Sequence, residues 1–131
     1  MKRKIAIELC ARFSLHSKEI LSRLTDDGDC VYLTSGWASD ANDHCAHMIL
    51  EQRGQSVYAH EMNAGGGTAS GERTKSSKYG NRITPGRTIR FASEKDVLSF
   101  ISCAFELKHL DHEKSSGVRS KEYVNMWEQF G

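Results

Sequence analysis

Hydrophobic residues recur along the chain in short runs whose spacing predicts where helices and strands lie. Near the N-terminus two patterns overlap, because Ile5, Ile7 and Leu9 alternate as in a strand while the apolar positions also follow the spacing of a helix. After Ser14 only the helical spacing continues. We therefore expect a helix over residues 5–24.

The middle of the chain favours strands, because it is rich in β-branched and aromatic residues. Residues 30–35 form one such run. Residues 45–52 and 55–63 form two more on either side of Gly54, which is the pattern of a β-hairpin. Residues 88–92 are expected to form a further short strand.

Two helices are expected in the last third of the chain. Ser93 is followed three residues later by an acidic residue, as at a helix N-terminus, and the next run places Val97, Ile101 and Phe105 on one face. A last helix begins at Ser120 and carries an apolar stripe of its own.

These elements predict an α+β fold: a small, mainly antiparallel sheet of about four strands with helices at both ends packed on one face. We expect a single domain over residues 1–131, because 131 residues with 38% hydrophobic content suffice for one core but not for two. The chain ends directly after an apolar helix face, which fits either a fragment of a larger protein or a helix that packs back. The expected core contains Val31, Leu33, Met48, Leu50, Val57, Val97, Ile101, Phe105 and Trp127.

The composition argues against several classes of protein. The formal net charge of +1 gives no overall attraction for nucleic acid, which is therefore not expected as a partner. No apolar run approaches the roughly 20 residues that span a bilayer, and the basic N-terminus lacks the apolar stretch of a signal peptide. We expect no membrane span and a cytoplasmic protein, or one delivered from a bacterium without a conventional signal peptide.

Three of the six histidines fall within residues 44–60, and the register of the predicted hairpin decides which of them share a face of the sheet. If the numbers of opposed residues sum to 107, His47 faces His60, and Cys45 lies on the same face. These are ligand types that zinc uses, but no fourth ligand is evident in the sequence. We therefore expect no metal ion and no cofactor.

If instead the loop has three residues centred on Gly54, opposed numbers sum to 108. His47 then faces Glu61, with Asn63 diagonally adjacent on the same face and His60 on the other. We expect this register, because three-residue hairpin loops need a residue that tolerates positive φ. A histidine oriented by an asparagine or a glutamate is the arrangement that activates a thiol nucleophile. The alternative for His47 is a packed side chain without a chemical role.

The hairpin resembles the part of papain-like cysteine proteases that holds their catalytic histidine and asparagine. In that family a histidine begins one strand and an asparagine ends the next, before a glycine-containing turn. His47, Asn63 and the glycines at 65–67 follow this order within residues 43–67. The resemblance implies a cysteine hydrolase or acyl transferase with a protein or peptide substrate. His47 would be its general base, with Asn63 or Glu61 as the orienting group.

The sequence offers no clear nucleophile for such an enzyme. Papain-like enzymes place a thiol at a helix N-terminus, where the helix dipole lowers its pKa, whereas Cys10 falls inside the first expected helix. Cys10 is still the best candidate among four cysteines, none of which forms the CxxC pair of a zinc ribbon or thioredoxin motif. Their even number permits two disulfides, but we expect reduced thiols because there is no export signal. A catalytically incomplete relative is equally compatible with the pattern, so the sequence leaves open whether the chain is an enzyme.

A glycine-rich basic segment over residues 64–90 favours a different function. Residues 64–88 show no sustained periodicity, and residues 72–90 carry six Lys and Arg against one Glu, a local charge of +5. Exposed backbone amides and basic side chains hold anions. The alternative is therefore a non-catalytic interaction module that binds a protein or a phosphate-bearing partner. Its expected contact residues are Trp37, Arg73, Lys75, Lys78 and Arg82.

Trp37 has a second interpretation. It follows Gly36, just after the first expected strand. An exposed tryptophan there would line a substrate groove beside the hairpin. A tryptophan in this position also commonly closes a hydrophobic core.

Overall fold

The computed structural model describes residues 3–41, 43–62, 73–76, 80–83 and 86–130, with the backbone alone at 3–7, 9–11, 73–76 and 80–83. Nine elements follow one another within these described residues. They are α1 (Arg3–Leu21), β1 (Cys30–Trp37), β2 (His44–Arg53), β3 (Ser56–Met62), β4 (Arg73–Ser76), β5 (Gly80–Ile83), β6 (Thr88–Arg90), α2 (Glu94–His109) and α3 (Ser116–Phe130).

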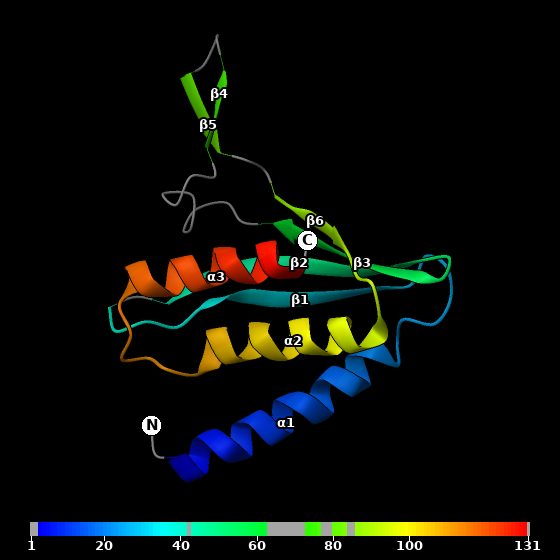
Figure 1. Cartoon of the computed structure of the whole chain (residues 1–131), viewed down its shortest axis with the longest axis horizontal. Coiled ribbons are helices and arrows are strands. Elements are labelled where there is room, and N and C mark those ends of the chain that lie inside the picture. The colour runs from blue at the N-terminus through cyan, green and yellow to red at the C-terminus, as the bar shows by residue number, and fades with distance from the viewer. Residues whose placement is uncertain (1–2, 42, 63–72, 77–79, 84–85, 131) are drawn as a thin grey trace.

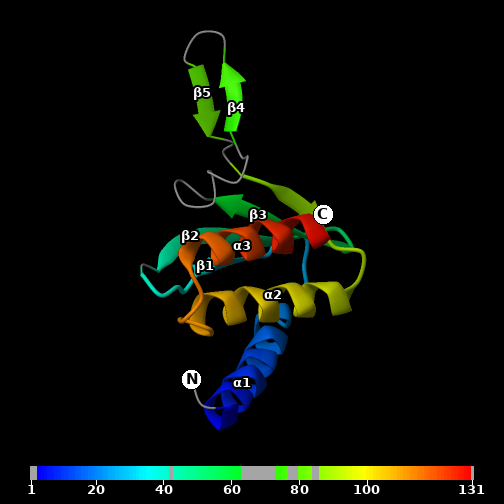
Figure 2. The same cartoon turned by 60° about the vertical axis from the view of Figure 1, so that its left-hand side comes forward.

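Four strands form an antiparallel sheet in the order β1-β2-β3-β6, and α2 and α3 cover one of its faces (Figure 1). This confirms the expected α+β fold. Helix α1 lies against α2 on the side away from α3, as both views show (Figures 1 and 2). None of the described helices lies on the other face of the sheet, which we call the open face. No described helix is long and apolar enough to cross a membrane.

The start of α2 follows its expected cap. The side chain of Ser93 accepts a hydrogen bond from the backbone N–H of Asp96 at 3.3 Å, and Glu94 adds an acidic residue to the first turn. The last helix begins at Ser116, four residues before its expected start. Residues 64–88 were expected to lack regular structure, but β4 and β5 pair there as a separate two-stranded sheet.

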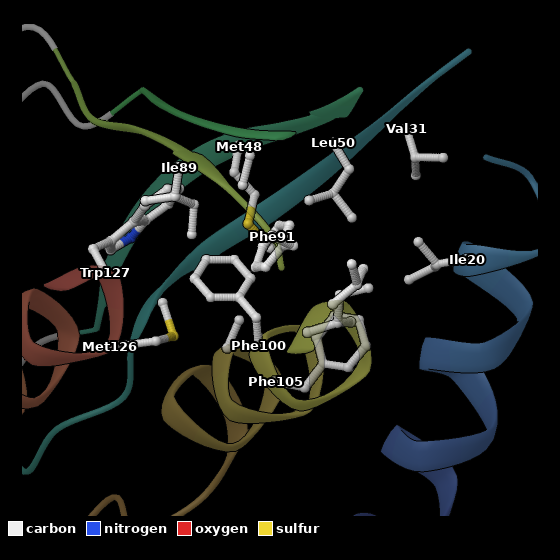
Figure 3. Packing of buried hydrophobic residues seen from close by; sticks show 14 of the residues in the cluster. Ile20, Val31, Met48, Leu50, Ile89, Phe91, Phe100, Phe105, Met126 and Trp127 are labelled. Atoms are coloured by element: carbon white, nitrogen blue, oxygen red, sulfur yellow. The ribbon is translucent and has the colours of Figure 1, made fainter. Parts of the chain in front are cut away.

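The core lies between the sheet and the two covering helices, and Figure 3 shows Met48 and Leu50 of β2 directed toward Phe100 of α2. The rings of Phe100 and Trp127 meet edge to face, with centroids 5.0 Å apart. Eight of the nine expected core residues are buried, and the ninth, Leu33, is partly buried against them. The helical stripes and the strand-like runs therefore identified the core correctly.

The expected hairpin register is wrong. Opposed residues of β2 and β3 sum to 109, with Arg53 paired with Ser56 across a two-residue turn. Gly54 has the expected positive φ, of 55°, but it is the first of two turn residues rather than the middle of three. A one-residue shift would turn Val57 out of the helix-covered face, where it is buried. Burial of this face therefore decides the register.

Trp37 closes the core, so its expected role as an exposed partner contact is wrong. Only 2% of its surface is exposed, and its ring lies 4.4 Å from that of His44 and 5.3 Å from that of Tyr123. Gly36 permits this position: its φ is 115°, and a Cβ atom there would overlap the backbone carbonyl of His44.

Candidate functional site

Of the residues expected to form a thiol-activating site, His47 and Glu61 are not brought together. His47 lies on the open face, whereas Glu61 pairs with Met48 and lies on the helix-covered face. Their side chains therefore project to opposite sides of the sheet, and Glu61 does not orient His47. Asn63 lies outside the described residues. Cys10 lies inside α1, but its side chain is not among those described.

His47 is packed among side chains of the open face. It stands between Thr34 and Met62 on the neighbouring strands, and its ring lies 5.7 Å from that of Tyr32. Its Nδ1 atom is buried and has no hydrogen-bond partner among the described residues. A catalytic imidazole needs an acceptor that fixes its tautomer and orientation, and no described residue supplies one to His47.

Glu61 instead belongs to a buried cluster beneath α3. Its carboxylate accepts hydrogen bonds from the hydroxyl of Tyr123 at 2.5 Å and from Nη1 of Arg87 at 3.1 Å. Burial, together with the carboxylate of Glu61, raises the pKa of Tyr123 above its usual range, so the hydroxyl remains a hydrogen-bond donor. The cluster joins β3, α3 and the residue before β6, which indicates a structural role.

The open face carries a second network that the sequence analysis missed. Nε2 of His60 lies 2.8 Å from Oε1 of Glu51, and Nδ1 lies 3.0 Å from the hydroxyl oxygen of Thr88. The hydrogen bond from His60 holds the pKa of Glu51 below its usual value. The three residues come from β2, β3 and β6, so only the strand register could have revealed that they meet.

These three group types also occur in catalytic triads, but their surroundings do not favour catalysis. Neither of the two cavities at the helices, one beside the N-terminus of α2 and one between β1, α1 and α2, is lined by His60 or Thr88, so neither would hold a substrate against the hydroxyl. We assign the network to cross-strand stabilisation. No group of three His, Cys, Asp or Glu side chains suited to a metal ion occurs in the part of the chain that the structure describes.

One cavity, of about 660 Å³, opens beside the N-terminus of α2. Leu24, Val57 and Phe91 line it, and Nε of Arg90 donates at its rim to the hydroxyl of Ser56 at 3.2 Å. The side chains of Gln52 and Ser93, which also line it, are hydrogen-bonded to the carbonyl of Gly54 and the backbone N–H of Asp96, and we assign no site to this cavity.

A second cavity, of about 380 Å³, is a groove between β1, α1 and α2. Aromatic rings dominate the side contributed by the helices. The lining residues are Phe13 and His16 from α1, Tyr32, Leu33 and Thr34 from β1, and Phe105 and His109 from α2. Partial burial, aided by the neighbouring Lys108 and His112, holds the pKa of His109 below its usual value, so its imidazole is uncharged at neutral pH.

The expected basic contact residues fall on the hairpin formed by β4 and β5. Arg73 and Lys75 lie on β4, opposite Ile83 and Asn81, while Arg82 on β5 lies opposite Thr74. Lys78 lies outside the described residues.

Comparison with known proteins gives no relative: no family model, curated protein or solved structure matches this chain. Its function is therefore inferred from its own geometry and charge.

Proposed function

We propose that this chain is a non-catalytic interaction domain that holds a phosphate-bearing partner on the hairpin β4–β5. The arrangement of the strands supports this proposal. In the described part of the chain, β4 and β5 pair only with each other, and the hairpin stands away from the four-stranded sheet in both views (Figures 1 and 2). An element outside the core is free to contact a partner.

The distribution of charge supports an anionic partner. The sequences of the two strands, RTKS and GNRI, contain three basic residues and no acidic one. The local charge of +5 over residues 72–90 exceeds the net charge of the whole chain, so the rest of the chain is net negative. One of the six cations, Arg87, is paired with Glu61, which leaves the hairpin as the main carrier of the local charge. Such a patch attracts phosphate groups in a salt-dependent way.

Neutralising the hairpin will weaken the binding of inorganic polyphosphate by at least about 10-fold at low salt, because each lost cation removes one phosphate contact. The variant combines Arg73→Gln, Lys75→Gln, Lys78→Gln and Arg82→Gln. Isothermal titration at several salt concentrations measures the affinity. The salt dependence of the variant will also be shallower.

The matched control removes four exposed cations from the helices instead. It combines Arg12→Gln, Lys18→Gln, Lys95→Gln and Lys121→Gln, and so produces the same change in net charge. Equal weakening in both variants would mean that net charge alone attracts the probe, which contradicts a binding site on the hairpin.

The papain-like hydrolase remains the alternative function, and it rests on the resemblance of residues 43–67. The described thiols differ in accessibility: Cys30 and Cys45 are exposed, whereas burial raises the pKa of the Cys103 thiol above its usual value. If the domain is non-catalytic, Cys103 will be the slowest of these three to react with iodoacetamide. His47→Ala will then leave the rate at every cysteine within about 2-fold.

Mass spectrometry of the alkylated chain across a range of pH measures each rate, that of Cys10 included. A cysteine that reacts rapidly near about pH 6, and at least about 10-fold more slowly in His47→Ala, would favour the hydrolase instead.

A further inference from the structure

Strand β1 presents unpaired backbone groups at the edge of the sheet. The backbone N–H of Gln52 donates to the carbonyl of Asp29 at 2.8 Å, which sets the alternation of the ladder between β1 and β2. By that alternation Cys30, Tyr32 and Thr34 direct their N–H and C=O groups away from β2. No backbone hydrogen bond links these three residues to another segment in the part of the chain that is described.

This edge lacks the features that normally prevent a strand from pairing with another. Its sequence, CVYLTSGW, contains no proline and no charged residue over eight positions. The opposite edge, β6, has only three residues and ends at Arg90. Natural sheets protect their edges with short strands, charges and prolines, so the long uncharged edge of β1 favours the addition of another strand.

Helix α1 supplies a second wall opposite this edge. The groove of about 380 Å³ lies between Tyr32 and Thr34 of β1 and Phe13 of α1, with Phe105 and His109 of α2 also lining it. A strand added to a sheet lies about 4.8 Å from its neighbour, with alternate side chains on the same face. One row of side chains of an added strand would therefore meet the rings of the groove.

The rings in the groove form one connected surface without a fixed charge. Phe13 lies 5.7 Å from both Phe105 and His109, and His16 stacks on Phe105 at 5.3 Å, measured between ring centroids. None of the lining residues is Lys, Arg, Asp or Glu, and the His109 imidazole is uncharged at neutral pH. A charged side chain would lose its hydration against these rings without gaining an opposite charge, so the groove favours an uncharged segment whose side chains are aromatic or branched aliphatic.

We propose that the groove between β1 and α1 binds an extended, uncharged segment of a partner protein, which pairs as an added strand with β1 and places an apolar side chain on Phe105 and His109. Backbone hydrogen bonds to Tyr32 and Thr34 supply the pairing, and the ring surface supplies the selectivity. This site is independent of the basic hairpin.

The test uses the acetylated peptide Thr-Val-Thr-Phe-Thr-Val-Thr as a probe, with a fluorescent label and detection by anisotropy. Two single variants of the full chain are expected to bind it at least about 10-fold more weakly. Thr34→Pro removes an N–H from the free edge without affecting the ladder to β2. His109→Lys introduces a charge beneath the apolar side chain at an exposed position.

Each variant has a matched control that is expected to bind within about 2-fold of the original chain. Arg90→Pro places a proline on the opposite edge, where the pairing with β3 also directs the backbone N–H of residue 90 away from the neighbouring strand. His112→Lys places the same charge at an exposed position outside the groove. A second peptide, with lysine in place of phenylalanine, is expected to bind at least about 10-fold more weakly than the first.

Three results would overturn the proposal. The first is no binding of the probe tighter than about 1 mM. The second is equal weakening by Thr34→Pro and Arg90→Pro. The third is that the chain alone sediments as a dimer that Thr34→Pro dissociates, which would make a second copy the occupant of the edge. None of these results bears on polyphosphate binding by the hairpin.

Discussion

Replacing Arg119 with methionine will lower the free energy of unfolding by about 3–5 kcal/mol. Only 3% of this residue is exposed, and its guanidinium donates hydrogen bonds to four backbone carbonyls and one carboxylate. The acceptors are Ala38 O at 3.0 Å, Leu107 O at 2.7 Å, Leu110 O at 2.9 Å, Glu106 O at 3.3 Å and Glu122 Oε2 at 2.6 Å. Arg119 therefore joins α3 to the C-terminal end of α2 and to the residue after β1.

The free energy of unfolding falls because methionine fills a similar space but donates no hydrogen bond. The last carbonyls of a helix have no partner within the helix, and here the Arg119 guanidinium supplies one. Urea denaturation followed by circular dichroism measures the change. Arg119→Lys is expected to lose less, because its ammonium group retains some of the donors.

The control is Arg23→Met, since the Arg23 side chain is 63% exposed. Its free energy of unfolding should change by no more than about 0.5 kcal/mol. A loss below about 1 kcal/mol in Arg119→Met would mean that the carbonyls find other partners, contrary to the buried cap described here.

Tyr123→Phe is expected to lower the free energy of unfolding by about 2–3 kcal/mol. The variant keeps the ring in the core but removes the hydroxyl that donates to the buried carboxylate of Glu61 at 2.5 Å. Glu61 then retains Arg87, whose Nη1 lies 3.1 Å from Oε1 and 3.4 Å from Oε2, so Oε2 of the buried carboxylate loses its shorter hydrogen bond. Tyr32→Phe is the matched control, because Tyr32 is 60% exposed and should change stability by no more than about 0.5 kcal/mol.

A double-mutant cycle separates the hydrogen bond from the packing of the ring. Glu61→Gln removes the charge and keeps an oxygen that accepts from Tyr123. If the charge-assisted hydrogen bond carries the effect, Tyr123→Phe will cost at least about 1 kcal/mol less in the Glu61→Gln background than in the original chain. Additive losses would assign the effect to packing instead.

The same hydroxyl gives stability a dependence on alkaline pH. Burial raises the pKa of Tyr123 in the folded state above the usual value, which the unfolded chain retains at about 10. Above that pH the unfolded state loses a proton that the folded state keeps, so stability falls as pH rises. Tyr123→Phe will have a shallower decline than Tyr32→Phe in urea denaturation above about pH 10. Equal slopes would contradict the assigned burial of the hydroxyl.

Local patterns of residues sufficed for much of the fold. The 3.6-residue spacing identified three helices, and the Ser93 cap located the start of α2, because both features depend on neighbours within one or two turns. Strand-like runs on either side of Gly54 identified the strands of the hairpin in the same way. These elements together indicated the α+β class and a core that includes Met48, Leu50 and Trp127.

The role of Arg119 in joining the helices was missed because the expected start of α3 was four residues too late. Arg119 lies four and eight residues before Tyr123 and Trp127, so it continues the buried stripe of α3. A cation on an apolar stripe indicates a buried polar contact, but the expected start of the helix at Ser120 left Arg119 outside the pattern. Its acceptors come from three other segments, and no local pattern identifies them.

The candidate site depended on distances that the sequence does not encode locally. Gly54 suits a turn of two residues as well as a turn of three. A shift of one residue in the strand register moves Glu61 from beside His47 to the opposite face of the sheet. Burial of Val57 against the helices selected the register, and α3 then brought Tyr123 to Glu61. The sequence alone determined which segments are helix or strand, because those preferences act over a few residues. Only the tertiary structure decided which polar groups meet, because burial of the whole sheet face sets the register from which their contacts follow.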